Sequence, residues 1–298
     1  MTCLWPANPL SERDGRKAAR YRATSLRVCA AVGFLMAAVS TDRAVAADWL
    51  DDTGLRGAMS SKSYGRWDGL NFGAQIGVSN MNTDFGNGTS SLVAYILRNS
   101  TLENEAAPSD WTALPSNTTN GRQFGGFVGY NVQYDQLVVG IDGAYNHVTS
   151  LQASAMDSIS RRVTTSDNIQ HDVTIQAQSS LKLVDYATLR ARAGYAIGQF
   201  LPYAVLGAAV GRFNYSNTAT VFDLQTPPVG APFAFGPQTL SDNKDNAIVG
   251  GFVTGLGVDV AILPNVFLRG EWEFVAFAPV HGLRANTNTG RVAIGVKF

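Results

Sequence analysis

The chain ends in Arg291-Val292-Ala293-Ile294-Gly295-Val296-Lys297-Phe298, and this stretch decides the fold. Successive side chains of a β-strand point to opposite faces, so every second residue here shares a face. One face is apolar, with Val292, Ile294, Val296 and Phe298, and the other face is small or charged. An exposed strand of this kind promotes aggregation in a soluble protein. A closed barrel in a lipid bilayer needs the pattern, because its apolar face meets lipid and its other face lines the interior.

The composition favours a β-rich membrane protein over a soluble enzyme. Only 15% of the 298 residues are charged and 30 are glycine, whereas about a quarter of the residues of a typical soluble protein are charged. No stretch approaches the ~20 apolar residues that a membrane-spanning helix needs. Strands rather than helices are therefore expected to cross the membrane.

Residues 1–46 are predicted to be a secretory signal peptide. A basic region is followed by an apolar run from Val28 to Val39, which is too short to span a bilayer, and Ala44-Val45-Ala46 has the small-x-small pattern of a cleavage site. Cleavage after Ala46 removes both cysteines and leaves 16 basic and 20 acidic residues. A net charge of about −4 argues against binding to nucleic acid, and a chain without cysteine has no disulfides or thiol catalysis. The alternative is an amphipathic first helix of a cytosolic domain.

Residues 47–66 are polar and unpatterned, and we interpret them as a periplasmic lead-in to a barrel formed by residues 67–298. Eight segments of that barrel alternate between apolar and polar positions. The connections between these segments alternate between short turns, such as Asp135-Gln136, and long polar stretches. Transmembrane barrels of bacteria have an even number of strands, short periplasmic turns and longer external loops. We predict an all-β fold: a closed eight-stranded antiparallel up-and-down transmembrane β-barrel with short periplasmic turns and long extracellular loops.

The long connections are expected near residues 80–121, 149–176, 214–246 and 277–289. In the first of them, only residues 92–97 favour a short strand. In the third, four prolines argue against any strand, because proline cannot donate to a sheet ladder. Residues 203–211 are apolar or small on both faces; we favour the alternative in which Tyr203 and Val205 point outward.

Charged side chains of the strands are predicted to gather inside the barrel. The interior of an eight-stranded barrel is just wide enough to be filled by side chains, and buried charges must be paired. We therefore expect an arginine–carboxylate network that plugs the lumen. A charged selective pore or a proton path is the alternative. The network consists of inward-facing residues: Asp142, Arg190, Arg192, Asp259, Arg269, Glu271 and Glu273.

Ligand-binding and catalytic sites have less support. The three histidines, His147, His171 and His281, fall at or beyond strand ends, where they are either haem or metal ligands or solvent-exposed loop residues, and no two have ligand spacing. Asp142, His147 and Ser150 lie near the end of one strand, but no second element offers a matched partner. We expect no catalytic, cofactor-binding or metal-binding residues and no enzymatic activity.

Several strand segments form an ordered set: Trp67–Gly73, Gly125–Asn131, Leu189–Tyr195, Leu201–Tyr203, Gly255–Asp259 and Gly295–Phe298. In order and spacing this set resembles the porin-family surface antigens of alphaproteobacteria, eight-stranded barrels of the OmpA/OmpX-like type. The resemblance covers nearly all strands and none of the loops, and Asp259 stands where the family is expected to have Glu. It implies outer-membrane insertion in a Gram-negative bacterium and a structural or surface-antigen role, with haemin binding in some members.

The resemblance also implies partners. These are outer-membrane lipid, the barrel insertion machinery and periplasmic chaperones, which recognise the C-terminal strand. We assign the assembly signal to Val292, Ile294, Val296 and Phe298. The expected function is that of a non-enzymatic structural protein and surface antigen without a cofactor. The alternative is haemin binding or passage of small solutes through loops or lumen, and association into a homo-oligomer is left open.

Overall fold

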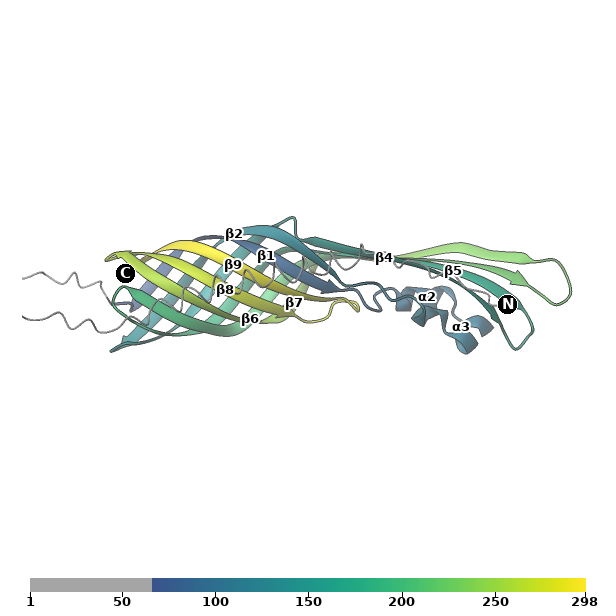
Figure 1. Cartoon of the computed structure of the whole chain (residues 1–298), viewed down its shortest axis with the longest axis horizontal. Coiled ribbons are helices and arrows are strands. Elements are labelled where there is room, and N and C mark those ends of the chain that lie inside the picture. Colours follow the sequence, from purple (N-terminus) through teal and green to yellow (C-terminus); the bar gives the residue numbers. More distant parts are fainter. Residues whose placement is uncertain (1–65) are drawn as a thin grey trace, which may run out of the picture. The chain divides into compact units, whose positions relative to one another are not determined.

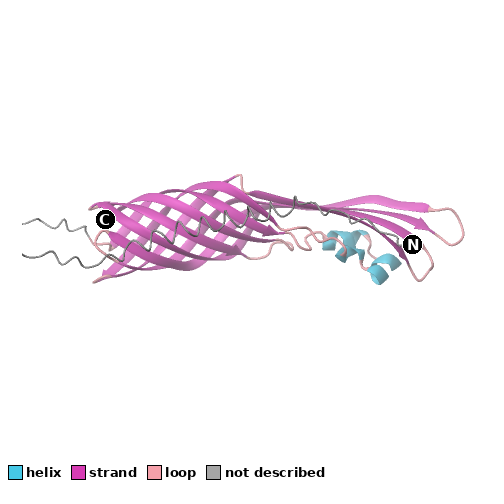
Figure 2. Ribbon diagram, in the orientation of Figure 1, coloured by secondary structure: helices cyan, strands magenta, loops and turns pink. Residues whose placement is uncertain are grey.

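The computed structural model describes residues 66–298, which are almost entirely β-sheet (Figures 1 and 2). The predicted signal peptide and nearly all of the predicted lead-in lie outside these residues. Both described α-helices, α2 (Ser90–Ile96) and α3 (Thr101–Ala106), and the 3₁₀ turn η1 (Pro108–Asp110) follow the first strand. Neither helix is long and apolar enough to cross a membrane.

Residues 66–298 contain nine strands: β1 Gly69–Asp84, β2 Asn117–Tyr134, β3 Leu137–Thr149, β4 Gln152–Thr164, β5 Gln170–Tyr195, β6 Phe200–Thr226, β7 Phe233–Leu263, β8 Val266–Phe277 and β9 Arg284–Lys297.

Eight of the nine strands pair in an antiparallel ring. The order is β3-β2-β1-β9-β8-β7-β6-β5, and β5 pairs with β3 from Leu137↔Tyr195 to His147↔Asp185. The last strand therefore lies beside the first, with Ile294 opposite Ala74. β4 is an additional strand that the sequence did not predict. It follows β3 after Ser150 and Leu151 and pairs with the preceding part of β5, so that it continues the line of β3 along that strand.

Alternation places side chains on the predicted faces of most strands. Ile76, Leu189 and Val292 are 60–66% exposed on the outside of the ring. On β6 the exposed apolar residues end at Val210, and Arg212 follows them. β1, farther round the ring, shows the same change, since its exposed Val78 is followed on the same face by Asn80. A band of apolar side chains thus surrounds the ring, and polar residues follow it at the end opposite the short turns.

The predicted orientation of β6 is wrong. Tyr203 and Val205 point inward and are 5% and 3% exposed, whereas Leu206 is 56% exposed. The sequence left the choice open because both faces of this strand are apolar or small. In the folded chain, the hydroxyl of Tyr203 donates a hydrogen bond to Glu271 at 2.6 Å. Gly257 on β7 makes room for the ring, because a Cβ there would lie 2.5 Å from it.

Two of the predicted loops are strands. Residues 152–182 form a β4–β5 hairpin, and residues 214–246 form the outer part of a β6–β7 hairpin. Together they make a four-stranded sheet beyond the ring, which we call the extension (Figure 1). Pro227, Pro228 and Pro232 lie in the connection between β6 and β7, as proline requires. Pro237 lies within β7, but at a register shift where the ladder between Val221 and Asp223 is interrupted.

Residues 92–97, predicted as a short strand, belong instead to α2 and its C-cap. Leu92, Val93 and Leu97 fall on one side of a helix, and they pack on one face of the extension. Their neighbours there form an apolar cluster with Leu102 of α3: Val173 and Ile175 of β5 and Ala219 and Val221 of β6. The extension therefore has a core of its own. The predicted fourth loop is also shorter than expected, because β9 begins at Arg284.

Candidate functional site

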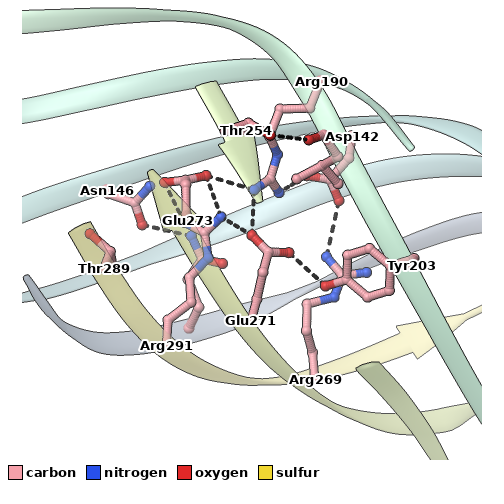
Figure 3. Close-up of polar contacts among 12 residues, drawn as sticks. Asp142, Asn146, Arg190, Tyr203, Thr254, Arg269, Glu271, Glu273, Thr289 and Arg291 are labelled. Carbon is pink, nitrogen blue, oxygen red and sulfur yellow. Dashed lines mark hydrogen bonds and ion pairs between the residues drawn. The ribbon is translucent and has the colours of Figure 1, made fainter. Parts of the chain in front are cut away.

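Arg190 of β5 is the centre of a buried charge network inside the ring (Figure 3). Its Nη1 donates to Glu271 Oε1 at 2.5 Å and to Glu273 Oε2 at 2.7 Å, both on β8. Its Nη2 donates to Asp142 on β3. Since β8 is not a neighbour of β5 in the sheet, the two bonds to Glu271 and Glu273 cross the interior of the ring, whereas Asp142 lies opposite Arg190 on the neighbouring strand.

Arg269 of β8 links the same network to β7. Its Nε donates to Asp259 Oδ1 at 2.9 Å, and its Nη1 donates to Asp142 Oδ2 at 3.0 Å. Arg192 of β5 donates to the other oxygen of Asp259 at 2.5 Å. The seven residues selected from the sequence are thus all in contact with at least one other member, and each is at most 5% exposed.

Three further members were not selected from the sequence. Arg291 of β9 binds Glu271 and, at 2.6 Å, Glu273. The sequence already indicates that Arg291 points inward, because it lies on the face of the strand opposite to Val292 and Ile294. Tyr203 donates to Glu271, and its ring lies 3.6 Å from the guanidinium of Arg192. Tyr186 donates to Glu273 at 3.1 Å. Alternation along β5 does not predict its inward orientation, because a β-bulge after Leu183 shifts the register.

The network is balanced in charge. Four arginines, Arg190, Arg192, Arg269 and Arg291, face four carboxylates, Asp142, Asp259, Glu271 and Glu273. Paired arginine and carboxylate groups tolerate burial because each charge has a partner and additional hydrogen bonds. The network as a whole therefore carries no net charge.

Apolar side chains fill the ring on both sides of this network. Toward the short turns, Trp67, Phe127 and Phe267 belong to one buried cluster. Toward the extension, Met81, Phe213 and Phe277 belong to another, in which the last two rings pack edge to face at 4.9 Å. Apolar clusters thus flank the charge network on both sides, and buried polar side chains of β1, among them Asn71, Gln75 and Ser79, lie beside them.

The histidines do not form a common site. His171, at the start of β5, is buried rather than exposed. Its Nδ1 lies 2.7 Å from Oδ2 of Asp223 on β6. His281 stacks on Tyr215, and its Nδ1 lies 3.1 Å from Asp242. Burial, together with that carboxylate, raises the pKa of the Tyr215 phenol.

Two residues of β3, His147 and Asp142, have partners of a structural kind. His147 packs against Phe124 with 5.2 Å between ring centroids. Asp142 is bound by two arginines. No group of three or more His, Cys, Asp or Glu side chains with the geometry of a metal site occurs within residues 66–298.

The C-terminal strand exposes the residues assigned to the assembly signal. Val292, Ile294 and Phe298 are 60%, 55% and 72% exposed, and Val296 is partly exposed, all on the outside of the ring. This apolar wall, an inward-facing charge network and strands that pair in a ring are the features of a barrel that sits in lipid.

Comparison with protein families agrees with this architecture. Residues 35–298 match the outer membrane protein β-barrel domain. The chain belongs to this family. It is an outer-membrane β-barrel protein of a Gram-negative bacterium, as the sequence predicted. A relative, the 25 kDa outer-membrane immunogenic protein of Brucella ovis, is 24% identical over 191 residues, which are 64% of this chain and 65% of that protein.

Two solved outer-membrane barrels are similar over most of their length. Ail of Yersinia pestis is 14% identical, with 78% of this chain and 99% of that chain covered and a TM-score of 0.32. Neisserial surface protein A is 13% identical, with 76% and 97% covered and a TM-score of 0.35. At this level of similarity, neither structure carries a functional conclusion for the present barrel.

Proposed function

We propose that this protein is a closed, non-conducting and non-enzymatic outer-membrane barrel that displays the extension on the cell surface as a structural protein and surface antigen. In this proposal β3 and β4 form one long transmembrane-to-surface strand, so the barrel has eight strands. The short turns, such as Asp135-Gln136, face the periplasm, and the extension faces outward, as is usual for bacterial barrels.

The filled interior is the observation that carries the proposal. An open pore needs an unobstructed lumen, whereas here bulky apolar side chains around Phe267 and Phe277 fill the ring on either side of the charge network. The network itself ties β3, β5, β7, β8 and β9 together across the lumen. Opening a path would separate buried ion pairs, which costs several kcal/mol for each pair that is broken. These features favour a plugged barrel over passage of small solutes.

Other parts of the proposal concern partners. Membrane lipid covers the apolar band, and the insertion machinery and periplasmic chaperones recognise the outward face of β9. The protein works without a resident cofactor. The separate surroundings of His147, His171 and His281 support this part, since haem ligation by imidazole needs a histidine that is free to face the iron.

Planar-bilayer recording of the purified protein tests the proposal. We expect no stable current steps under conditions in which a general porin, reconstituted in parallel, conducts. Stable unitary currents from the wild-type protein would show that the lumen is open.

Orientation is tested separately with single cysteines, which are informative because both native cysteines lie within residues 1–46. Asn243→Cys in the extension should react with an impermeant maleimide on intact cells. Asp135→Cys, in a short turn, should react only after the outer membrane is opened. The reverse pattern would contradict the proposed orientation.

A further inference from the structure

The extension has one face that no other element of residues 66–298 covers. The helices α2 and α3 pack on the opposite face, against Val173 and Ala219. On the uncovered face, neighbouring strands carry uncharged polar side chains, all at least partly exposed. We call this surface the polar face, and its central residues are Gln176 and Gln178 of β5, Thr218 and Thr220 of β6, and Thr239 and Ser241 of β7.

The six side chains form a regular grid. Gln176 lies opposite Thr220, which lies opposite Thr239. Gln178, Thr218 and Ser241 form a second row in the same way. Adjacent strands are about 4.8 Å apart, and rows separated by two residues are about 6.6 Å apart. The grid therefore presents hydrogen-bonding groups at fixed intervals in two directions.

Hydrogen bonds within the rows hold the hydroxyl groups in place. Thr220 Oγ1 lies 2.8 Å from Thr239 Oγ1, and Thr218 Oγ1 lies 2.9 Å from Ser241 Oγ. A hydroxyl group has one donor and two acceptor positions, so each keeps capacity for a further partner. An ordered set of donors and acceptors loses little conformational entropy when it binds a ligand.

The chemistry of the grid selects a neutral polar partner. None of its six residues is charged, whereas about a quarter to a third of an ordinary solvated surface consists of Lys, Arg, Glu and Asp. The charges nearest the tip of this face, Arg162 and Asp172, pair with each other at 2.5 Å. A charged ligand would find no opposite charge on the grid, whereas the hydroxyl groups of a sugar chain match its hydrogen-bond donors and acceptors.

The position of the grid identifies the source of such a chain. The apolar band on β6 ends at Val210, and Thr218 and Thr220 follow eight and ten residues later. At about 3.3 Å per residue, the grid lies roughly 25–35 Å beyond the band along the strand. This is the layer in which the sugar chains of the outer-leaflet glycolipid stand. We propose that the polar face binds the neutral polysaccharide of that glycolipid; this rests on the proposed outward orientation of the extension.

Calorimetric titration of the full-length protein in detergent tests the proposal. The probe is the neutral polysaccharide released by mild acid from smooth lipopolysaccharide, and rough lipopolysaccharide without that polysaccharide is the comparison. We expect saturable binding of the released polysaccharide and none of the rough form. The triple variant Thr218→Val, Thr220→Val and Thr239→Val keeps side-chain shape without hydroxyl groups and should bind at least tenfold more weakly.

Thr118→Val is the matched control, since Thr118 is an exposed threonine on β2, away from the grid. It should bind as the wild type does. Each variant is first checked for a folded, heat-modifiable band; if the triple variant fails this check, Gln176→Leu with Gln178→Leu replaces it. The proposal is overturned by a wild type that does not bind, by unchanged binding in the grid variant, or by equal binding of rough lipopolysaccharide. Because the titration is done in detergent, its failure is distinct from failure of the conductance and orientation tests.

Discussion

The ring of Phe298 stacks on the ring of Phe72 in β1, with 5.7 Å between centroids and 16° between planes. The backbone N–H of Phe298 also donates to the carbonyl of Leu70 at 2.9 Å. The final residue of the chain is thus fixed to the first strand of the ring. Its side chain is nevertheless 72% exposed on the outer wall, where a recognition factor or lipid can reach it.

Deletion of Phe298 should impair assembly more than loss of any other exposed aromatic residue near the short turns. The deletion removes both the stacking on Phe72 and the end of the proposed assembly signal. Tyr134→Ala is the control, because Tyr134 is an aromatic residue that is 66% exposed at the end of β2 next to a short turn. We expect the deletion to lower the heat-modifiable outer-membrane fraction several-fold and Tyr134→Ala to leave it near normal. Equal levels of the two variants would show that Phe298 has no special role.

Arg190→Met should destabilise the barrel strongly. The substitution leaves Asp142, Glu271 and Glu273 with fewer cationic partners, and removal of one member of a buried ion pair typically costs about 3–5 kcal/mol. Urea unfolding in lipid vesicles, followed by tryptophan fluorescence, measures the effect. Arg162→Met is the control, because Arg162 pairs with Asp172 at an exposed site, and it should not shift the transition. Adding Glu271→Gln to Arg190→Met should restore part of the lost stability; no recovery would point to packing rather than charge.

Alternation with a period of two was enough to place the charge network. One face is clearly apolar in each of the strands that contain Asp142, Arg190 and Glu271. These three side chains lie on the other face, so they could only point inward. The same rule assigns Arg291 to the interior. What alternation does not give is which charges meet, because Arg190 and Glu271 lie on strands that are not neighbours. That contact depends on the curvature and register of the whole ring.

Prediction failed where local sequence does not distinguish alternatives. Both faces of residues 203–211 are apolar or small, and the inward orientation of Tyr203 depends on Glu271 and on the space above Gly257, both distant in sequence. The extension was read as loops because its polar face and short polar runs resemble connecting segments. Its strands are stabilised by apolar contacts with α2 and α3, which no local pattern reports.

Tyr203→Phe should destabilise the network through a single hydrogen bond. The variant keeps the ring beside Arg192 but removes the hydroxyl that donates to Glu271 at 2.6 Å. Loss of a donor to a buried group costs about 1–3 kcal/mol. Tyr130→Phe removes the same atom from an outward side chain that is 53% exposed, so its unfolding transition in lipid vesicles should match the wild type. If Tyr203→Phe also matched the wild type, the inward orientation of Tyr203 would be in question.

Val93→Asp should open the extension without unfolding the barrel. Val93 is fully buried between α2 and the extension, whereas the two apolar clusters of the ring, one of which continues into the extension, contain no residue of α2. A carboxylate in that position is buried without a partner, which strongly disfavours the packed state. Limited proteolysis in detergent should cleave the variant within residues 85–116, while the heat-modifiable band of the barrel persists. Tyr95→Asp, on the same helix but 56% exposed, should resist protease as the wild type does. Loss of heat-modifiability in Val93→Asp would show instead that the extension and the barrel unfold as one unit.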